Sequence, residues 1–356
     1  MRDDDVIWEI PQQTTKKHEI LGNYLKAWFA IMQKHSPELL YLDGFAGPNE
    51  YVGGQKGSPQ IALDAAMANP HLYTNKKLSL VFSELDRQRF DKLNRWATVQ
   101  SETAPGYLQI TADHTDFESM ARDLIETDLF RRQPALFAFV DPFGVSVPIH
   151  LLAELTAPRK SELLVLFAFD FVNRFSTAGN VDRSLTELFG CDRFKTAPHG
   201  SPRDRKLYLV ELYETQLRDV CGFKYVSRFE MVREDGKTTY FLMHCTRSLK
   251  GVEVFRETMW KIDPVAGRRF SARDEYEGAL FGSEQLINLD REIKKRFSGS
   301  TVSIEQLEAF VLDETPYKVS HLRKFGLKPL ADAGQLKLLT PARKNTYPRG
   351  TKLKIL

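Results

Sequence analysis

Acidic residues stand at the ends of several short apolar segments of the chain. Asp43 follows ELLYL, Glu84 follows LSLVFS, Asp113 closes YLQITAD and Asp141 follows ALFAFV. Short, continuous apolar runs are typical of parallel strands that are buried on both faces. Because open parallel sheets bind ligands at the carboxyl ends of their strands, we expect these four carboxylates to lie along one ligand-binding edge.

The first of these carboxylates opens a glycine-containing loop, DGFAGP. Glycines let a backbone approach a nucleoside cofactor closely. The spacing does not match the GxGxxG of dinucleotide sites, and the chain has no GxxxxGK[ST] segment for a triphosphate. An ordinary turn between a strand and a helix is the alternative. The loop residues expected to contact a cofactor are Asp43, Gly44, Phe45, Ala46 and Gly47.

Two further carboxylates have places that suit a nucleoside. An acidic residue after the second strand accepts hydrogen bonds from ribose hydroxyls in such folds, and we expect Glu84 to do so. Asp113 is expected to accept the adenine amino group while Asp116 caps the next helix, although these two roles can be exchanged. Together with Asp141 and the absent dinucleotide spacing, this set favours S-adenosylmethionine as the cofactor.

The segment Asp141-Pro142-Phe143-Gly144 is the candidate acceptor site. A carboxylate there can accept from an amino group, and the ring can stack on a planar base. The segment resembles the (Asp/Asn)-Pro-Pro-(Tyr/Phe) signature of amino-methyltransferases without its second proline, and a type I turn is the alternative. Because methyl transfer needs mainly positioning, we expect Asp141 to be the base or amine acceptor. The catalytic candidates are Asp141, Phe143 and Asn173.

Polar residues also follow the fifth apolar run, in the segment DFVNR. We expect Asn173 and Arg174 to line the cleft or to grip an anionic substrate, and a helix cap with a salt bridge is an equally good interpretation. Lys17 and His18 on the first helix could reach the same cleft. A lone histidine on an amphipathic helix is more often a surface residue, so they are not among the site candidates.

The elements that must position these residues follow from periodicity. Residues 16–35 predict an amphipathic helix, and five apolar runs, the last over 162–170, alternate with helical stretches. Two alternating segments around Asp235-Gly236 predict a hairpin. The predicted fold class is therefore α/β, with a Rossmann methyltransferase-like sheet of parallel strands plus a terminal antiparallel hairpin, helical additions and a C-terminal winged-helix module.

The last part of the chain is predicted to be separate and basic. Ser298-Gly299-Ser300 suggests a boundary between a cofactor-binding domain over 1–298 and a winged-helix-like domain over 299–356. Residues 301–356 hold ten Lys and Arg against five Asp and Glu. A protein-docking module with a basic face is the alternative to nucleic-acid binding. The expected phosphate contacts are Arg174, Arg323, Lys324, Lys328, Arg343 and Lys344.

The composition excludes several classes of protein. The chain has 356 residues, 42% of them hydrophobic and 27% charged, and a net charge of +3, as in ordinary globular proteins. Its three cysteines, Cys191, Cys221 and Cys245, form no CxxC pair, which argues against a disulfide framework and a metal site. No apolar stretch approaches the roughly 18 residues of a membrane span, so a soluble cytoplasmic protein is expected.

Longer strings of the sequence resemble one known family. The chain is similar to three-Cys-motif partner (TcmP) proteins over nearly its whole length, in YLDGFAGPNEYVGGQKGSP, FSELD, FAFVDPFG, FVNRF, TRSLKGVEVFRETMWKIDP and HLRKFGLKPLADAGQL. The resemblance implies a Rossmann methyltransferase that associates with a separate three-Cys-motif protein resembling radical S-adenosylmethionine enzymes. The chain's own cysteines are not that motif. Asn49 stands where such loops often carry a further glycine, and is expected to stiffen the turn.

These observations lead to one hypothesis and two alternatives. The hypothesis is an S-adenosylmethionine-dependent methyltransferase that modifies nucleic acid together with a partner protein. The first alternative is an adaptor that binds the nucleoside cofactor without catalysis. The second is a nucleic-acid-binding regulator in which the Rossmann domain serves only as a scaffold.

Overall fold

The computed structural model describes residues 6–73, 75–142, 144, 147–176, 181–272, 288–340 and 347–356. The chain divides into two compact units. One comprises Met1–Arg247 with Phe270–Ala272, and the other comprises Ser248–Arg269 with Arg273–Leu356. The predicted boundary at residue 298 lies inside the second unit, and the division at that point stays a prediction.

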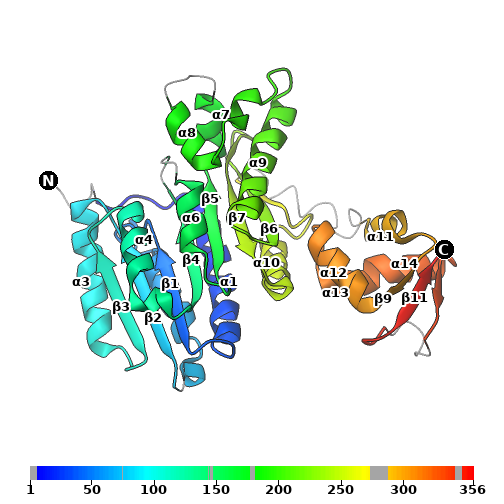
Figure 1. Ribbon diagram of the computed structural model, residues 1–356, viewed down its shortest axis with the longest axis horizontal. Coiled ribbons are helices and arrows are strands. Elements are labelled where there is room, and N and C mark those ends of the chain that lie inside the picture. Colours follow the sequence, from blue (N-terminus) through cyan, green and yellow to red (C-terminus); the bar gives the residue numbers. More distant parts are fainter. Residues whose placement is uncertain are drawn as a thin grey trace. The chain divides into compact units, whose positions relative to one another are not determined.

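A sheet of eight strands forms the centre of the first unit (Figure 1). Its order is β3-β2-β1-β4-β5-β7-β6-β8, in which β1 to β5 are parallel and β7 is antiparallel to both β5 and β6. The predicted parallel sheet with a terminal hairpin is thus confirmed. The strands are β1 (Glu38–Asp43), β2 (Lys77–Ser83), β3 (Leu108–Asp113), β4 (Ala135–Val140), β5 (Glu162–Phe167), β6 (Tyr225–Val232), β7 (Thr238–Thr246) and β8 (Arg269–Ser271).

Helices cover both faces of this sheet, and alternate strand residues pack against each layer. Leu40 and Leu42 of β1 belong to a core shared with α4, α6, α8 and α9. Tyr41 points the other way and stacks on Phe137, whose ring also meets Trp28 of α1. The helices and helical turns are α1 (Gln12–Met32), α2 (Ser58–Met67), η2 (Pro70–Tyr73), α3 (Arg87–Thr103), α4 (Phe117–Glu126), α5 (Asp128–Arg131), α6 (Ile149–Leu155), α7 (Phe169–Phe175), α8 (Asp182–Phe189), η3 (Arg193–Thr196) and α9 (Pro202–Asp219).

The fifth strand ends earlier than its apolar run suggests. β5 stops at Phe167, and Asp170 lies in the first turn of α7. An acidic residue is favourable there because the helix N-terminus carries partial positive charge. The apolar run predicted over 162–170 is therefore a strand only as far as Phe167.

The second unit has its own apolar core, built from α11, α12, the helical segments after them and a three-stranded sheet. In that sheet β11 pairs antiparallel with both β10 and β9. The identification of this unit as a winged helix stays a prediction. Its elements are α10 (Leu249–Ile262), α11 (Leu289–Phe297), β9 (Thr301–Ser303), α12 (Ile304–Glu314), α13 (Val319–His321), η5 (Leu322–Leu327), α14 (Lys328–Asp332), β10 (Leu336–Leu338) and β11 (Lys352–Ile355).

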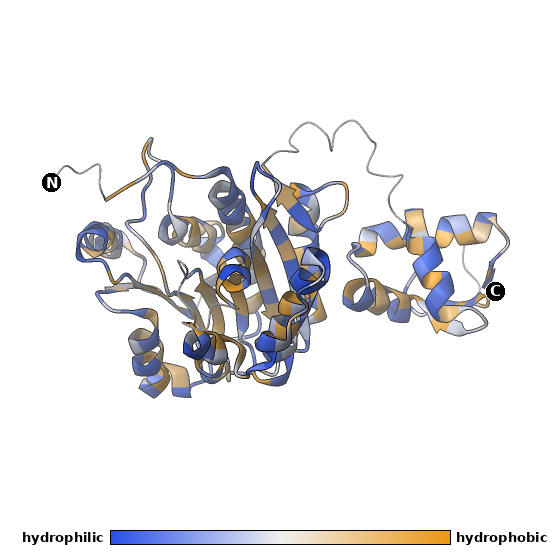
Figure 2. Ribbon diagram, turned by 90° about the horizontal axis from the view of Figure 1, so that it is seen from above, coloured by the Kyte–Doolittle hydropathy of each residue, from blue (hydrophilic) through white to orange (hydrophobic). Residues whose placement is uncertain are grey.

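Three consecutive helical segments, α13, η5 and α14, follow one another over residues 319–332. The middle segment, η5, is a π-helical turn that precedes Pro329. Proline has no N–H and its ring collides with the carbonyl four residues earlier, so a wider turn accommodates it. Buried apolar residues form the cores of both units, and Figure 2 shows both units coloured by hydropathy. Among the described residues, no helix combines the length and apolar character needed to cross a membrane.

Candidate functional site

The loop after β1 is fixed by hydrogen bonds to the two neighbouring strands. The N–H of Gly44 donates to the carbonyl of Phe139 in β4, at 3.1 Å. The N–H of Ala46 donates to the carbonyl of Ser83 at the end of β2, at 3.0 Å. The Ser83 hydroxyl in turn donates to the carbonyl of Gly44, at 2.9 Å. The loop is therefore held at the carboxyl edge of the sheet without any ligand.

The two glycines of this loop serve different purposes. A Cβ on Gly44 would lie 2.2 Å from the ring of Phe117, so this glycine is required by packing. Gly47 has a φ of +65°, and a Cβ there would meet no atom within 4 Å. Because left-handed backbone and open space coincide at Gly47, a side chain would project into the space left free beside the loop.

Glu84 joins this loop to the end of β2. Its Oε2 accepts from the N–H of Gly47 at 3.0 Å, and its Oε1 accepts from the N–H of Asp86 at 2.8 Å. The residue is only 9% exposed. A carboxylate fixed by two backbone donors still has lone pairs for further donors such as ribose hydroxyls.

A cavity of about 690 Å³ opens beside Glu84. Its walls come from the segments that follow β1, β2 and β3, with Val147 from the segment after β4. Phe45 and Phe117 stack with ring centroids 5.6 Å apart, and Leu85 is 66% exposed despite its apolar side chain. Apolar walls with a few fixed polar groups are the usual make-up of a small-molecule site, and this volume suits a nucleoside.

Asp113 and Asp116 lie at different places around this cavity. Asp116 lines it and also caps α4, accepting from the N–H of Ser119 at 2.9 Å, which lowers the pKa of its carboxyl group. Asp113 is half-buried and is not among the lining residues, and burial raises its pKa. The capping role of Asp116 is confirmed, and it is the carboxylate that borders the cavity.

Asp141 is buried at the end of β4, where its Oδ2 accepts a short hydrogen bond from Nζ of Lys17 in α1. The two side chains form an ion pair and are 6% and 11% exposed. The surface position favoured for His18 is wrong, because His18 is buried, as is Lys17. Lys17, which sequence reasoning left out of the site, neutralises the carboxylate proposed as base or amine acceptor.

His18 lies beside this pair as a neutral ring. Its pKa is lowered to about 3, mainly by burial and further by the charge of Lys17. Its ring is near that of Tyr51, with centroids 5.8 Å apart. Nδ1 is buried and has no hydrogen-bond partner among the residues that the structure describes. The imidazole is therefore uncharged at neutral pH.

Asp43 is completely buried, at the first residue of the loop. Burial raises its pKa to about 7, and the nearby Asp141 carboxylate adds to the rise. Hydrogen bonds from Ser58 and from the N–H of Phe45, the latter at 3.2 Å, act in the opposite direction. Its carboxyl group is thus divided between protonated and ionised forms near neutral pH.

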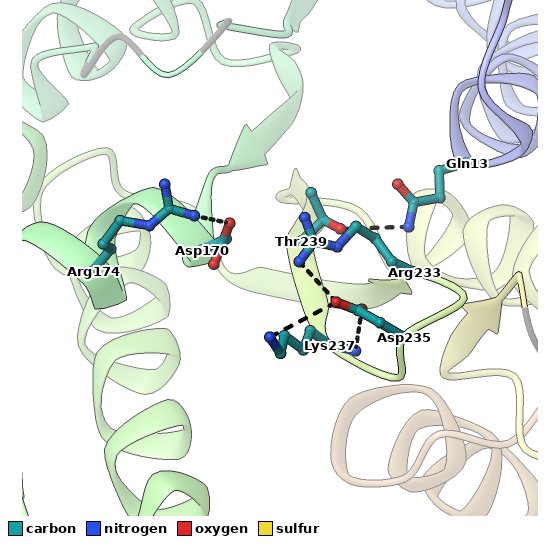
Figure 3. Close-up of polar contacts among 7 residues, drawn as sticks. All are labelled: Gln13, Asp170, Arg174, Arg233, Asp235, Lys237 and Thr239. Atoms are coloured by element: carbon teal, nitrogen blue, oxygen red, sulfur yellow. Dashed lines mark hydrogen bonds and ion pairs between the residues drawn. The ribbon is translucent and has the colours of Figure 1, made fainter.

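The residues predicted beyond β5 have partners within the first unit. Oδ1 of Asn173 accepts from Nε of Arg205 at 3.0 Å. Arg174 is 62% exposed and forms an ion pair with Asp170 at 2.8 Å (Figure 3). These contacts match the interpretation as a salt bridge and helix-end contact, while their catalytic and substrate-binding roles stay predictions. Phe143 lies outside the described residues.

The basic residues predicted to contact phosphates in the second unit are partly described. Arg323, Lys324 and Lys328 are exposed. Nη2 of Arg323 donates to the carbonyl of Tyr347 at 3.3 Å, and Lys324 lies over the ring of Phe325. Arg343 and Lys344 lie outside the described residues. Nucleic-acid binding by this unit stays a prediction.

The cysteine thiols are free, and the described residues contain no group of three His, Cys, Asp or Glu side chains that could hold a metal ion. Cys221 and Cys245 are buried, and burial raises the pKa of both thiols, to about 12 in the case of Cys221. These two thiols are therefore protonated at neutral pH and poor nucleophiles.

Comparison with known proteins gives remote structural likenesses. No protein-family model and no curated protein matches the chain. A putative caffeoyl-CoA O-methyltransferase from Staphylococcus aureus is similar with a TM-score of 0.30 and 5% identity, over 62% of this chain and 82% of that one. A SAM-dependent methyltransferase from Methanosarcina mazei is similar with a TM-score of 0.28 and 12% identity, over 59% and 92%. The α/β class is defined by the strand order, independently of these likenesses.

Proposed function

We propose that the first unit binds S-adenosylmethionine and is a methyltransferase. The observation that carries this proposal is the hydrogen bond between Gly47 and Glu84 at the rim of the 690 Å³ cavity. It brings a glycine loop and a buried carboxylate together at the strand ends where open α/β sheets bind nucleosides. The strand order, with its terminal antiparallel hairpin, is the one expected for this class of enzyme.

The residues of the cavity fit such a cofactor. Glu84 would accept from the ribose hydroxyls, and Leu85 and Phe117 would offer apolar surface to the adenine ring. Asp116, which caps α4, also lines the cavity and could accept from the adenine amino group, the role predicted for Asp113. Gly47 leaves the space beside the loop open for close approach.

The buried pair Lys17–Asp141 would suit the amino-acid end of the cofactor. That end carries a carboxylate and an ammonium group, which need one cationic and one anionic partner. Lys17 would donate to the carboxylate, and Asp141 would accept from the ammonium group or from an amino group of the acceptor. The bound cofactor supplies an activated methyl group, so the protein's main task is to align the acceptor and exclude water.

A proton released by the acceptor needs a base near neutral pH. Asp43 has a pKa raised to about 7, but it is completely buried and is not among the residues that line the cavity, so it is not the candidate base. Asp141 remains the candidate for accepting from an amino group. Asn173 and Phe143 remain candidates for holding the acceptor.

The acceptor and the partner rest on sequence alone. A nucleic-acid acceptor is supported by the exposed cations Arg174, Arg323, Lys324 and Lys328 and by the predicted winged helix. A separate three-Cys-motif protein as partner is supported by the resemblance to TcmP proteins. An adaptor that binds the cofactor without catalysis uses the same cavity and is the second candidate.

The enzyme and the adaptor are distinguished by methyl transfer. The full chain is incubated with S-adenosylmethionine labelled on the methyl group, and the label is followed into cellular RNA, DNA and protein. Label in nucleic acid supports an enzyme acting on nucleic acid. Its loss in Asp141→Asn assigns Asp141 to the acceptor only if that variant is folded and still binds the cofactor, and loss of cofactor binding assigns Asp141 to the cofactor instead. Cofactor binding without transfer to any fraction supports the adaptor, and transfer only to protein overturns the nucleic-acid acceptor.

A further inference from the structure

A second cavity, of about 500 Å³, lies in the first unit beside the continuation of the same loop. Its walls come from the loop residues after Pro48, from Gln60 of α2 and from one face of α3. None of its lining residues also lines the cavity of about 690 Å³ beside Glu84. It is thus a separate cavity, and the first residue that lines it, Pro48, directly follows Gly47 in the sequence.

The walls of this cavity carry an excess of positive charge. Lys92 and Arg95 are three positions apart on α3 and therefore share a helix face. Neither forms an ion pair with any other residue in the part of the chain that the structure describes. Lys56 is neutralised by Asp64 at 2.6 Å, and Glu50 is the one acidic residue among the lining residues. Two cations without an ion-pair partner therefore line the cavity together with one carboxylate, that of Glu50, which leaves a net charge of +1.

An aromatic ring completes the wall. The Nε1 of Trp96 donates to Oε1 of Gln60 at 2.8 Å, and the ring meets Phe82 edge-on with centroids 5.7 Å apart. Because the indole N–H is already used, the part of Trp96 that remains for a ligand is its ring surface. Both contacts fix the ring before any ligand arrives, which reduces the entropy lost on binding.

The loop wall is also formed in advance. Asn49 has a φ of +65°, and its Oδ1 accepts from the N–H of Gln60 at 2.8 Å. The N–H of Gly57 donates to the carbonyl of Asn49 at 2.9 Å, and Glu50 pairs with Lys56 in an antiparallel bridge. The expected stiffening by Asn49 is therefore confirmed, and the cavity is closed on this side by a braced turn.

We propose that this cavity binds a nucleotide of a nucleic-acid strand, with its phosphate at Lys92 and Arg95 and its base against Trp96. Cations beside a fixed aromatic ring are the combination that recognises a phosphate joined to a planar base. An acidic peptide would satisfy the cations but would leave the ring surface unused. The inference rests on the proposed function in one respect, the nucleic-acid class of the acceptor.

The test measures strand binding by the full chain without cofactor, so it does not depend on the outcome for S-adenosylmethionine. Fluorescence anisotropy follows a labelled single-stranded RNA 12-mer with wild type, Lys92→Ala/Arg95→Ala, Trp96→Phe and Lys26→Ala/Lys34→Ala. The last variant loses the same two charges from exposed positions on or just after α1. Circular dichroism checks that each variant is folded.

We expect Lys92→Ala/Arg95→Ala to weaken binding about tenfold and to reduce the slope of log K against log salt by about 1.4, since each cation contributes about 0.7 on a single strand. Lys26→Ala/Lys34→Ala should bind almost as wild type does. The strand should quench tryptophan fluorescence in wild type, and Trp96→Phe should lose this quenching. Equal weakening by both double variants, or no weakening by either, overturns the proposal.

Competition distinguishes the possible ligands. An unlabelled strand should displace the labelled one, whereas polyglutamate of the same length should compete at least tenfold less well. Equal competition by polyglutamate overturns the nucleotide assignment and favours an acidic peptide. AMP added in excess should displace part of the labelled strand from wild type and so lower its anisotropy. AMP should have no such effect on Lys92→Ala/Arg95→Ala. Tighter binding of AMP than of the strand would overturn the strand as the natural source.

Discussion

Lys17 of α1 and Asp141 at the end of β4 form an ion pair whose side chains are only 6% and 11% exposed. A buried charge destabilises the folded state unless a partner neutralises it, so each residue offsets the desolvation penalty of the other. The pair connects the N-terminal helix with the carboxyl edge of the sheet, beside the loop that begins at Asp43. It therefore links α1 to the edge of the sheet where the candidate site is proposed.

Removing one member of this pair should destabilise the fold. Lys17→Met leaves Asp141 buried without a countercharge, and we expect the free energy of unfolding to fall by about 3–5 kcal/mol. Urea denaturation measures the change. The double variant Lys17→Met/Asp141→Asn, which has no buried charge at either position, should recover most of it. A loss below about 1 kcal/mol in Lys17→Met would contradict the buried pair.

Gly44→Ala should also be destabilising, for a steric reason. The new Cβ would lie 2.2 Å from the Phe117 ring, so the ring or the loop must move, at a cost of about 1–3 kcal/mol. Gly106→Ala is the matched control, because a Cβ there meets no atom within 4 Å. Thermal unfolding of both variants checks this expectation. Equal melting temperatures would show that Phe117 does not pack on Gly44.

Because the pKa of Asp43 is raised in the folded chain, the free energy of unfolding should decrease as the pH rises. Since its pKa is about 7 in the folded chain and near 4 when unfolded, the folded state binds more protons between these values. Relative to Asp43→Asn, wild type should therefore lose about 1.4 kcal/mol of unfolding free energy per unit between pH 4 and 7. Urea titrations at several pH values measure the difference. Parallel curves for the two proteins would contradict it.

His18 should have the opposite effect on stability, so that its contribution to the free energy of unfolding decreases as the pH falls. Its pKa is about 3 in the folded chain and near 6.5 when unfolded, so the unfolded state binds more protons between these values. Relative to His18→Gln, wild type should lose on the order of 2 kcal/mol as the pH falls from 6.5 to 5. The same titrations apply, and the Asp43 contribution cancels because both proteins contain it. A constant difference across this range would mean that the ring is accessible to protons.

The sheet was predictable because four of its five parallel strands are short, mostly apolar and largely buried runs, and the turn at Asp235-Gly236 indicated the hairpin. The place of Glu84 followed from the same pattern. The boundary between β5 and α7 could not be predicted from this pattern, because the residues between Glu162 and Asp170 are apolar in both elements. Local periodicity cannot tell a buried strand from the first turn of a buried helix.

The part of α1 in the site was harder to predict, although a signal existed. Lys17 shares a helix face with Leu21, Tyr24 and Trp28, all of them buried. A polar residue on an apolar stripe indicates a buried partner, but the partner is 124 positions away and only the fold brings it close. The contact of Asn173 with Arg205 was not predictable for the same reason, because the two residues are 32 positions apart and only the fold brings them together.

The most direct test of the central claim is calorimetry with S-adenosylmethionine and its demethylated product. Wild type should bind both with one molecule per chain, and Glu84→Gln should bind them at least about tenfold more weakly, because it loses the charge that accepts from ribose. Glu211→Gln, an exposed change on α9, should bind as wild type does. Absence of binding in wild type, or an unchanged affinity in Glu84→Gln, would contradict the account.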